Sequence, residues 1–211
     1  MKQVVVLLAD WANGIFAVLL ASWVTGVDVL WWHFLIGLLL SHVPDIDALP
    51  ELLRRGRVAA SAVHSADHRT FLHYPVFAVG LMALAVWFVG YWGWVLTFAV
   101  LLHLINDLYG TGWGLKVLWP LSNRNYKVLG RRVNRLKHLL QVDGDWERLS
   151  VEERRLRPII SWSADELPQY ITRWGVDDWV PYWYYNLNWV SGVEYILFGV
   201  ACTAAIGTLI W

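Results

Sequence analysis

The sequence has very little cysteine: Cys202 is the only one in 211 residues, and it lies within an apolar run. A single cysteine cannot form an internal disulfide, and it excludes a thiolate-rich structural metal site. We interpret Cys202 as a small packing residue. The chain also lacks a surplus of either charge, because 17 Lys and Arg balance 17 Asp and Glu. Nucleic acid is therefore not an expected partner, since binding to its phosphates needs a basic surplus.

A cleavable secretory signal is not expected either. Lys2 is the only early cation, and Asp10 and Asn13 interrupt the first apolar run. What the sequence has in excess is apolar and aromatic residues, with 57% hydrophobic residues and 16 Trp. This hydrophobic fraction exceeds the roughly 45–50% of ordinary globular domains, so a membrane protein is expected.

Long apolar runs predict the fold class. A helix of about 20 apolar residues crosses about 30 Å of hydrocarbon, and the runs indicate about five spans in an all-α, polytopic membrane bundle. The predicted spans are residues 4–24, 29–43, 74–89, 94–109 and 189–211. Residues 1–110 would form the bundle that carries the site, residues 111–188 a cap at the membrane interface, and residues 189–211 a last span. All three belong to one integrated domain.

The cap, residues 111–188, is expected to be helical and amphipathic. Residues 124–141 place leucine and valine among Lys127, Arg131, Arg132, Arg135 and Lys137, which predicts a basic helix lying flat on an anionic membrane surface. Ser150 and Glu153 have the spacing of a capping box, which predicts a second, charged helix that ends by Pro158. The aromatic-rich residues 174–189 are expected in the headgroup zone, with a soluble core as the alternative.

The distribution of positive charge predicts the orientation. With five spans, the N-terminus, residues 44–73 and residues 110–188 share one side of the membrane, and they hold all 17 Lys and Arg. Positive residues collect on the cytoplasmic side of membrane proteins. The sequence therefore predicts a cytoplasmic N-terminus and a cytoplasmic cap.

Histidine and aspartate residues gather at the predicted cytoplasmic ends of the spans. His103 and Asp107 are four residues apart, on one face of an otherwise apolar helix. Ionisable residues at membrane depth are costly and indicate function. Imidazole and carboxylate ligands suit Zn²⁺, with Mn²⁺ or Fe²⁺ as alternatives, and one to three ions are expected. The predicted metal ligands are Asp10, Asp45, Asp47, His68, His73, His103 and Asp107.

Several of these polar residues have simpler explanations. Asp47 could instead cap a following helix. His42 and His64 are expected to support the ligands or to lie in a loop, and His33 is most simply a buried core histidine. His138 lies on the predicted amphipathic helix, where it would be solvated unless the cap supplies a ligand.

Three motifs, in order along the chain, carry a family resemblance. They are Pro44-Asp-Ile-Asp47, then His68-Arg69 with His73, and then His103 with Asp107, followed by Gly110-Thr-Gly112 and Trp119-Pro120. Over about residues 1–125 they resemble the YdjM-like family of bacterial and archaeal inner-membrane proteins, regarded as metal-dependent hydrolases. That family has a histidine early in its first helix, for which the nearest candidates here are Asp10 and Asn13. The ligand order is more distantly similar to zinc-dependent phospholipase C, which implies a phosphoester substrate by analogy.

The expected function combines this chemistry with the membrane location. A metal with an open position lowers the pKa of its bound water from about 16 to about 7. We expect a metal-dependent hydrolase at the cytoplasmic face of the bacterial or archaeal inner membrane, acting on a phosphoester bond of a lipid or amphiphile. Asp47 would bridge metals or orient the water, and Arg69 would hold an anionic group of the substrate. The alternatives are metal or ion transport, and a non-catalytic membrane scaffold with a structural metal.

Overall fold

The computed structural model describes residues 4–56, 58, 61 and 69–210. Within this part of the chain, three helices are long and apolar enough to cross a membrane. They are α1 (Leu7–Thr25), α5 (Tyr91–Tyr109) and α10 (Trp189–Ile210). A short 3₁₀ turn, Val4–Val6, precedes α1 and extends its apolar run. The prediction of a membrane protein with long apolar helices is therefore confirmed for three of the expected spans.

Two other predicted spans are apolar helices that are shorter than expected. They are α2 (Trp31–Leu40), with 10 residues, and α4 (Pro75–Val89), with 15 residues. At 1.5 Å per residue, helices of these lengths reach only about 15 Å and 22 Å. α2 begins after Leu30, whose backbone is extended, and ends at Leu40, shortly before Pro44. Length and composition thus do not confirm a count of five spans.

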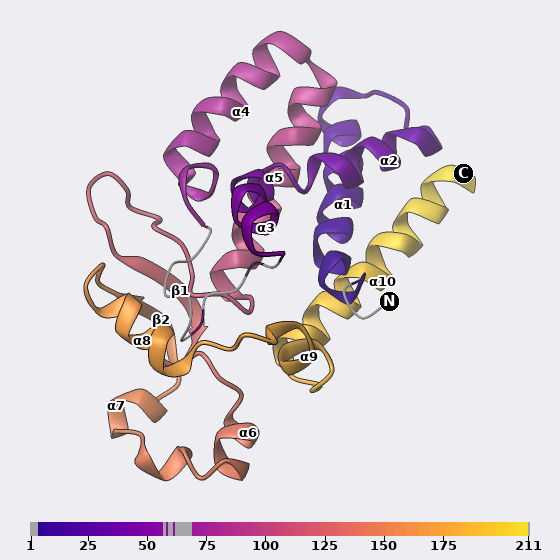
Figure 1. Ribbon diagram of the computed structural model, residues 1–211. Coiled ribbons are helices and arrows are strands. Elements are labelled where there is room, and N and C mark those ends of the chain that lie inside the picture. Colours follow the sequence, from indigo (N-terminus) through magenta and orange to yellow (C-terminus); the bar gives the residue numbers. More distant parts are fainter. Residues whose placement is uncertain (1–3, 57, 59–60, 62–68, 211) are drawn as a thin grey trace.

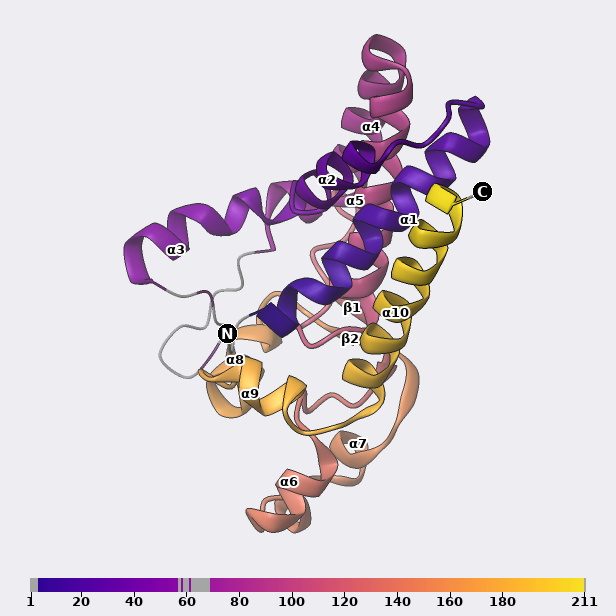
Figure 2. The ribbon, with the colours of Figure 1, turned by 90° about the vertical axis from the view of Figure 1, so that its right-hand side faces the viewer.

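Small residues let the first helices pack closely. α1 packs against α2, α5 and α10, and α4 packs against α5 (Figures 1 and 2). Their shared core is rich in alanine, which allows close helix approach within a membrane. The fully buried members of this core include Ala17, Val18, Ala21, Val95 and Ala99. At the crossing of α1 and α2, Gly14 meets the backbone of Gly37, because a Cβ on Gly14 would lie 2.5 Å from Gly37 O.

The connections at the site end of the bundle contain short helical segments. The 3₁₀ turn Pro44–Ala48 leads into α3 (Leu49–Arg55), and the 3₁₀ turn Phe71–His73 leads into α4. The alternative role of Asp47, as the cap of α3, does not apply, because Ala48 occupies the cap position and no side chain caps the helix. The Asp47 carboxylate instead accepts hydrogen bonds from Thr70 N at 2.9 Å and Thr70 Oγ1 at 3.1 Å.

The predicted basic helix over residues 124–141 is wrong. Its first part is the strand β1 (Asn125–Gly130), which pairs antiparallel with β2 (Arg157–Trp162), so the protein is mostly helical rather than all-α. Burial in β1 begins with a period of two, since Asn125 and Lys127 are buried and Tyr126 is only partly so. The strand ends where Leu129 adopts a φ of 52° before Gly130. Only the end of the segment is helical, as α6 (Lys137–Val142).

The rest of the cap consists of short helices around an aromatic core. The capping box is confirmed, since Ser150 N donates to Glu153 Oε2 at 2.9 Å and Glu153 N donates to Ser150 Oγ at 3.2 Å. The helix that it opens, α7 (Val151–Arg154), ends before Pro158 as predicted. The remaining elements are the 3₁₀ turn Trp146–Arg148, α8 (Glu166–Trp174) and α9 (Trp179–Tyr184). The buried core of the cap includes Trp113, Leu140, Trp162, Ile171 and Trp174.

The aromatic residues before α10 are divided between the interior and the surface. Trp183 and Tyr184 are buried against Val190, whereas Tyr185 and Trp189 are about half exposed. The cap, the N-terminal end of α1 and the start of α10 all lie at one end of the helical bundle (Figures 1 and 2). This is the end at which the predicted ligands meet.

Candidate metal centre

Four of the predicted ligand residues each direct one polar atom into a common volume. His73 Nε2 lies 3.3 Å from Asp107 Oδ2 and 3.7 Å from Asp45 Oδ1. His103 Nε2 lies 3.5 Å and 3.6 Å from the same two oxygens. In tetrahedral zinc coordination, bonds of about 2.0–2.1 Å separate the ligand atoms by about 3.3–3.4 Å. The four N–O distances are therefore close to the spacing that one divalent cation requires, and we call these four atoms the central group. Within it, Asp45, His73 and His103 offer ligand atoms that all lie within 4.8 Å of one another.

Each member of the central group is placed by a helix end or by helical periodicity. Asp45 lies in the 3₁₀ turn that follows α2, and His73 ends the 3₁₀ turn that precedes α4. His103 and Asp107 lie one turn apart near the end of α5, so both face the same side. His73, His103 and Asp107 are buried, whereas 36% of the Asp45 side chain is exposed. The central group is thus closed on three sides and accessible at Asp45.

The second nitrogen of each imidazole contacts a carboxylate outside the central group. His73 Nδ1 lies 3.0 Å from Asp47 Oδ2, and His103 Nδ1 lies 2.8 Å from Asp10 Oδ1. Such a carboxylate holds the proton on the remote nitrogen of a metal-binding histidine and fixes the orientation of its ring. Both Nε2 atoms face the centre. Asp10 and Asp47 therefore lie beside the rings rather than in the central group.

The pKa of His73 reflects these contacts. Burial alone would lower it, but the neighbouring carboxylates of Asp107 and Asp47 outweigh burial and raise the pKa above its ordinary value. The ring is completely buried. His73 thus lies in a strongly negative surrounding, which also favours a bound cation.

Arg69 and Gly112 fix the orientation of Asp107. Arg69 Nη2 lies 2.5 Å from Asp107 Oδ1, which leaves Oδ2 to face the imidazoles. Among the described residues, this buried Oδ2 accepts no hydrogen bond. A buried acceptor without a donor is unfavourable, and a cation coordinated there would satisfy it. The donor set and this oxygen both fit a divalent metal.

Substitution of Gly112 by alanine is expected to weaken metal binding. A Cβ at Gly112 would overlap the Arg69 guanidinium, so the guanidinium must move away from Asp107. Loss of an outer contact to a metal ligand typically weakens affinity about 10- to 100-fold, and we expect a decrease of about tenfold. The measurement is Zn²⁺ affinity by chelator competition. Gly199→Ala in α10 is the control, since its Cβ would contact nothing within 4 Å. Equal affinities for the two variants would contradict this role of Gly112.

A second possible metal-binding group adjoins the first. Asp10, His42 and Asp45 offer ligand atoms that all lie within 4.8 Å of one another, and His42 Nδ1 is 3.8 Å from Asp10 Oδ2. Asp45 belongs to both groups, which is the arrangement expected of a carboxylate between two ions. We had predicted only a supporting or loop role for His42. The signal in the sequence was its position three residues before Asp45.

Other predicted residues lie elsewhere. His68 and His64 are outside the described residues. His33 is buried near the opposite end of α5, where Leu30 N donates to His33 Nδ1 at 3.3 Å, as expected of a core histidine. His138 is exposed and follows the first residue of α6.

Two buried charged residues near the site had no predicted role. Glu194 in α10 is 3% exposed, and a Cβ on Gly110 would lie 3.8 Å from its Oε1. An acidic residue in an apolar span was the available signal. Lys127 in β1 is 4% exposed, and its Nζ donates to Gly112 O at 3.0 Å and to Asn134 Oδ1 at 2.7 Å. Burial and the nearby Arg69 lower the pKa of Lys127 to about 7.

These features define a helical membrane protein with a buried centre of histidine and aspartate side chains. The chain belongs to the YdjM inner membrane protein family, whose model matches residues 11–157. This confirms the resemblance seen in the three motifs. The match includes all four members of the central group and begins one residue after Asp10. Searches of curated proteins and of solved structures find no match to the chain.

Proposed function

We propose that this protein is a metal-dependent hydrolase embedded in the inner membrane, which cleaves a phosphoester bond of a lipid or amphiphilic substrate. The observation that carries the proposal is the central group, in which two imidazole nitrogens face two carboxylate oxygens at 3.3–3.7 Å. A mixed nitrogen and oxygen donor set suits Zn²⁺, with Mn²⁺ or Fe²⁺ as alternatives.

Each residue of the site has a proposed role. His73, His103 and Asp107 would bind a metal on the buried side, and Asp45 would complete the site on the accessible side. Asp47 and Asp10 would hold the two rings, as their contacts to Nδ1 indicate. A bound cation supplies Lewis acidity and lowers the pKa of water to about 7. Arg69, beside Asp107, is proposed to attract an anionic oxygen of the substrate as well.

The position of the site supports a cytoplasmic location. Asp45 and His73 lie between α2 and α4, yet they meet Asp10 at the start of α1 and Asp107 at the end of α5. These contacts support the proposal that α2 and α4 also run between this end of the bundle and the other. Among the residues that the structure describes, every Lys and Arg lies in the segments at the site end. The positive-inside rule then favours the cytoplasm for this end, where headgroups of the inner leaflet could reach the site.

Metal removal tests the proposal. Purified full-length protein would be stripped with a chelator, reloaded with Zn²⁺, Mn²⁺ or Fe²⁺, and assayed against a panel of phospholipids. We expect no turnover without metal and recovery with one of these ions. The measurements are bound metal by mass spectrometry and released product. Stoichiometric metal without turnover of any ester would exclude the hydrolase. Flux of the ion into proteoliposomes would instead support transport.

A structural metal is the second candidate. The central group already offers four protein ligands, as closed structural zinc sites do, whereas catalytic sites keep one position open. In that case the stripped protein would lose thermal stability, and reloading would restore stability without producing turnover. The exposure of Asp45 and its place in the second group favour the catalytic proposal. Asp45 is the ligand best able to move and open a coordination position, or to be shared between two ions.

A further inference from the structure

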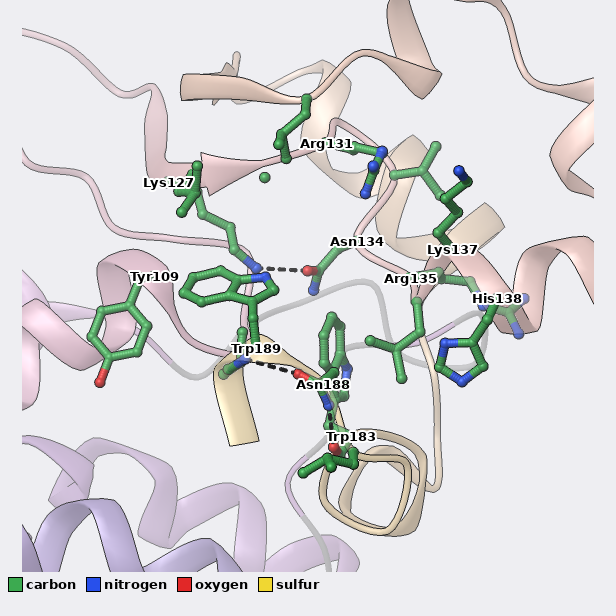
Figure 3. A pocket seen from close by; sticks show the side chains of 17 residues that line it. Tyr109, Lys127, Arg131, Asn134, Arg135, Lys137, His138, Trp183, Asn188 and Trp189 are labelled. Atoms are coloured by element: carbon green, nitrogen blue, oxygen red, sulfur yellow. Dashed lines mark hydrogen bonds between the residues drawn. The ribbon is translucent and has the colours of Figure 1, made fainter. Parts of the chain in front are cut away.

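A separate cavity of about 240 Å³ lies between β1, the segment leading to α6 and the start of α10 (Figure 3). We call it the basic pocket, because five of its lining residues are Lys, Arg or His. These are Lys127, Arg131, Arg135, Lys137 and His138. None of the lining residues is Asp or Glu. Lys127, Arg131, Arg135 and Lys137, which the sequence predicts on a flat helix, thus line a cavity instead.

The charges of the basic pocket are poorly neutralised by the protein itself. Arg135 Nη2 lies 3.3 Å from Asp143 Oδ2, outside the lining. Lys127 donates only to neutral oxygens, and Arg131 Nε donates to the carbonyl of Arg154 at 2.8 Å. In the described part of the chain, no carboxylate lies within 4.0 Å of Lys127, Arg131 or Lys137. A buried lysine without a counter-ion is unfavourable, and an anion in the pocket would supply one.

The rim of the basic pocket is apolar and continues into a candidate span. Trp189, which lines the pocket, is the first residue of α10. Leu187 is 80% exposed, and Leu129 and Leu156 are also exposed, although all three line the pocket. Lys127 Nζ lies 5.7 Å from the centre of the Trp183 ring, and both side chains line the pocket (Figure 3). An amphiphile could therefore place its charged end in the pocket and its chain along the start of α10.

We propose that the basic pocket binds the phosphate-bearing headgroup of an anionic membrane lipid, at a site distinct from the metal centre. The segment Thr111-Gly112 separates the two sites. On the pocket side, Asn134 Nδ2 donates to Thr111 O at 2.7 Å and Lys127 donates to Gly112 O. On the other side, Gly112 packs against Arg69, which holds Asp107. The proposal does not depend on hydrolase activity.

Lipid binding to the full-length protein tests this site. The protein would be placed in phosphatidylcholine nanodiscs with a rising fraction of phosphatidylglycerol, and bound lipid would be counted by native mass spectrometry. Arg131→Gln combined with Lys137→Gln is expected to weaken phosphatidylglycerol binding at least about tenfold, because each charge-assisted contact contributes strongly. Arg148→Gln combined with Arg173→Gln is the matched control, with the same change of charge at exposed residues outside the pocket.

A second variant tests the apolar rim and does not endanger folding. Leu187→Ser, at a highly exposed residue, is expected to weaken phosphatidylglycerol binding while leaving the unfolding temperature unchanged. Inorganic phosphate, added as a competitor, is expected to displace the lipid poorly. Equal loss of lipid in the pocket and control double variants would overturn the proposal. A second result would also overturn it. If the same concentration of inorganic phosphate displaced phosphatidylglycerol from the wild-type protein and from Leu187→Ser, the ligand would be the free anion rather than the lipid.

Discussion

Replacement of His103 by alanine is expected to remove the metal from the central group. The variant loses Nε2, which faces both Asp45 Oδ1 and Asp107 Oδ2, and it leaves the Asp10 carboxylate without the ring that it contacts. His73, Asp45 and Asp107 would remain as donors. The carboxylates of Asp10, Asp45 and Asp107 would also repel one another. Loss of an outer contact weakens metal affinity about 10- to 100-fold, and loss of a ligand should weaken it more. Bound Zn²⁺ after dialysis and affinity by chelator competition are the measurements.

His33→Ala is the matched control for His103→Ala. Both histidines are buried in apolar helices, with 5% exposure each, and both substitutions remove the same volume. His33 packs among the rings of Trp32, Tyr91 and Trp92, away from the central group. We expect this variant to keep its metal, whatever its loss of stability. Full metal content in His103→Ala would show that the ligand set is wrong.

Gly14→Ala is expected to have a large effect on assembly of the bundle. A Cβ at this position would lie 2.5 Å from Gly37 O and 2.8 Å from Leu38 N, and backbone atoms cannot rotate away as a side chain can. α1 and α2 must then separate. Overpacking of this kind typically costs about 1–3 kcal/mol, and more where the backbone itself must shift. We expect a lower unfolding temperature, measured by thermal denaturation in detergent.

Separation of α1 from α2 should also weaken the metal centre. The chain continues from α2 directly into the turn that carries Asp45, whereas Asp10 belongs to α1. Gly80→Ala in α4 is the control, because its Cβ would contact nothing within 4 Å. Comparable unfolding temperatures and metal affinities for Gly14→Ala and Gly80→Ala would refute the close crossing.

Much of the central group could be predicted from the sequence because it depends on periodicity and on helix ends. A four-residue spacing places His103 and Asp107 on one face of any helix. Both are ionisable residues within an apolar helix, and this contrast indicates a functional site. Asp45 and His73 follow and precede neighbouring apolar helices, so chain reversal brings them to the same end. These arguments need no knowledge of side-chain packing.

The errors arose where contacts link segments far apart in the chain. Over residues 124–141, helical periodicity favoured an amphipathic helix, but β2 supplies a pairing partner more than 30 residues after Asn125. Pairing with Ile160 and burial beside Asn134 hold Lys127 inside the protein, which no charge pattern indicates. Tertiary contacts of this kind override local preference.

The division of roles among the aspartates also depends on side-chain geometry. The sequence placed Asp10, Asp45, Asp47 and Asp107 near one another, but it did not say which carboxylates face a metal and which hold a ring. That distinction rests on the contacts of Asp10 and Asp47 with the two Nδ1 atoms. The hydrogen bond from Arg69 to Asp107 also depends on packing, because it needs the space that a side chain at residue 112 would occupy.

The order of the donors along the chain has a consequence for biosynthesis. Asp10, His42, Asp45, His73, His103 and Asp107 all precede residue 108, whereas both strands of the cap follow residue 124. A growing chain therefore holds every member of both metal-binding groups before any of the sheet has been translated. The cap is the last part to be made before α10.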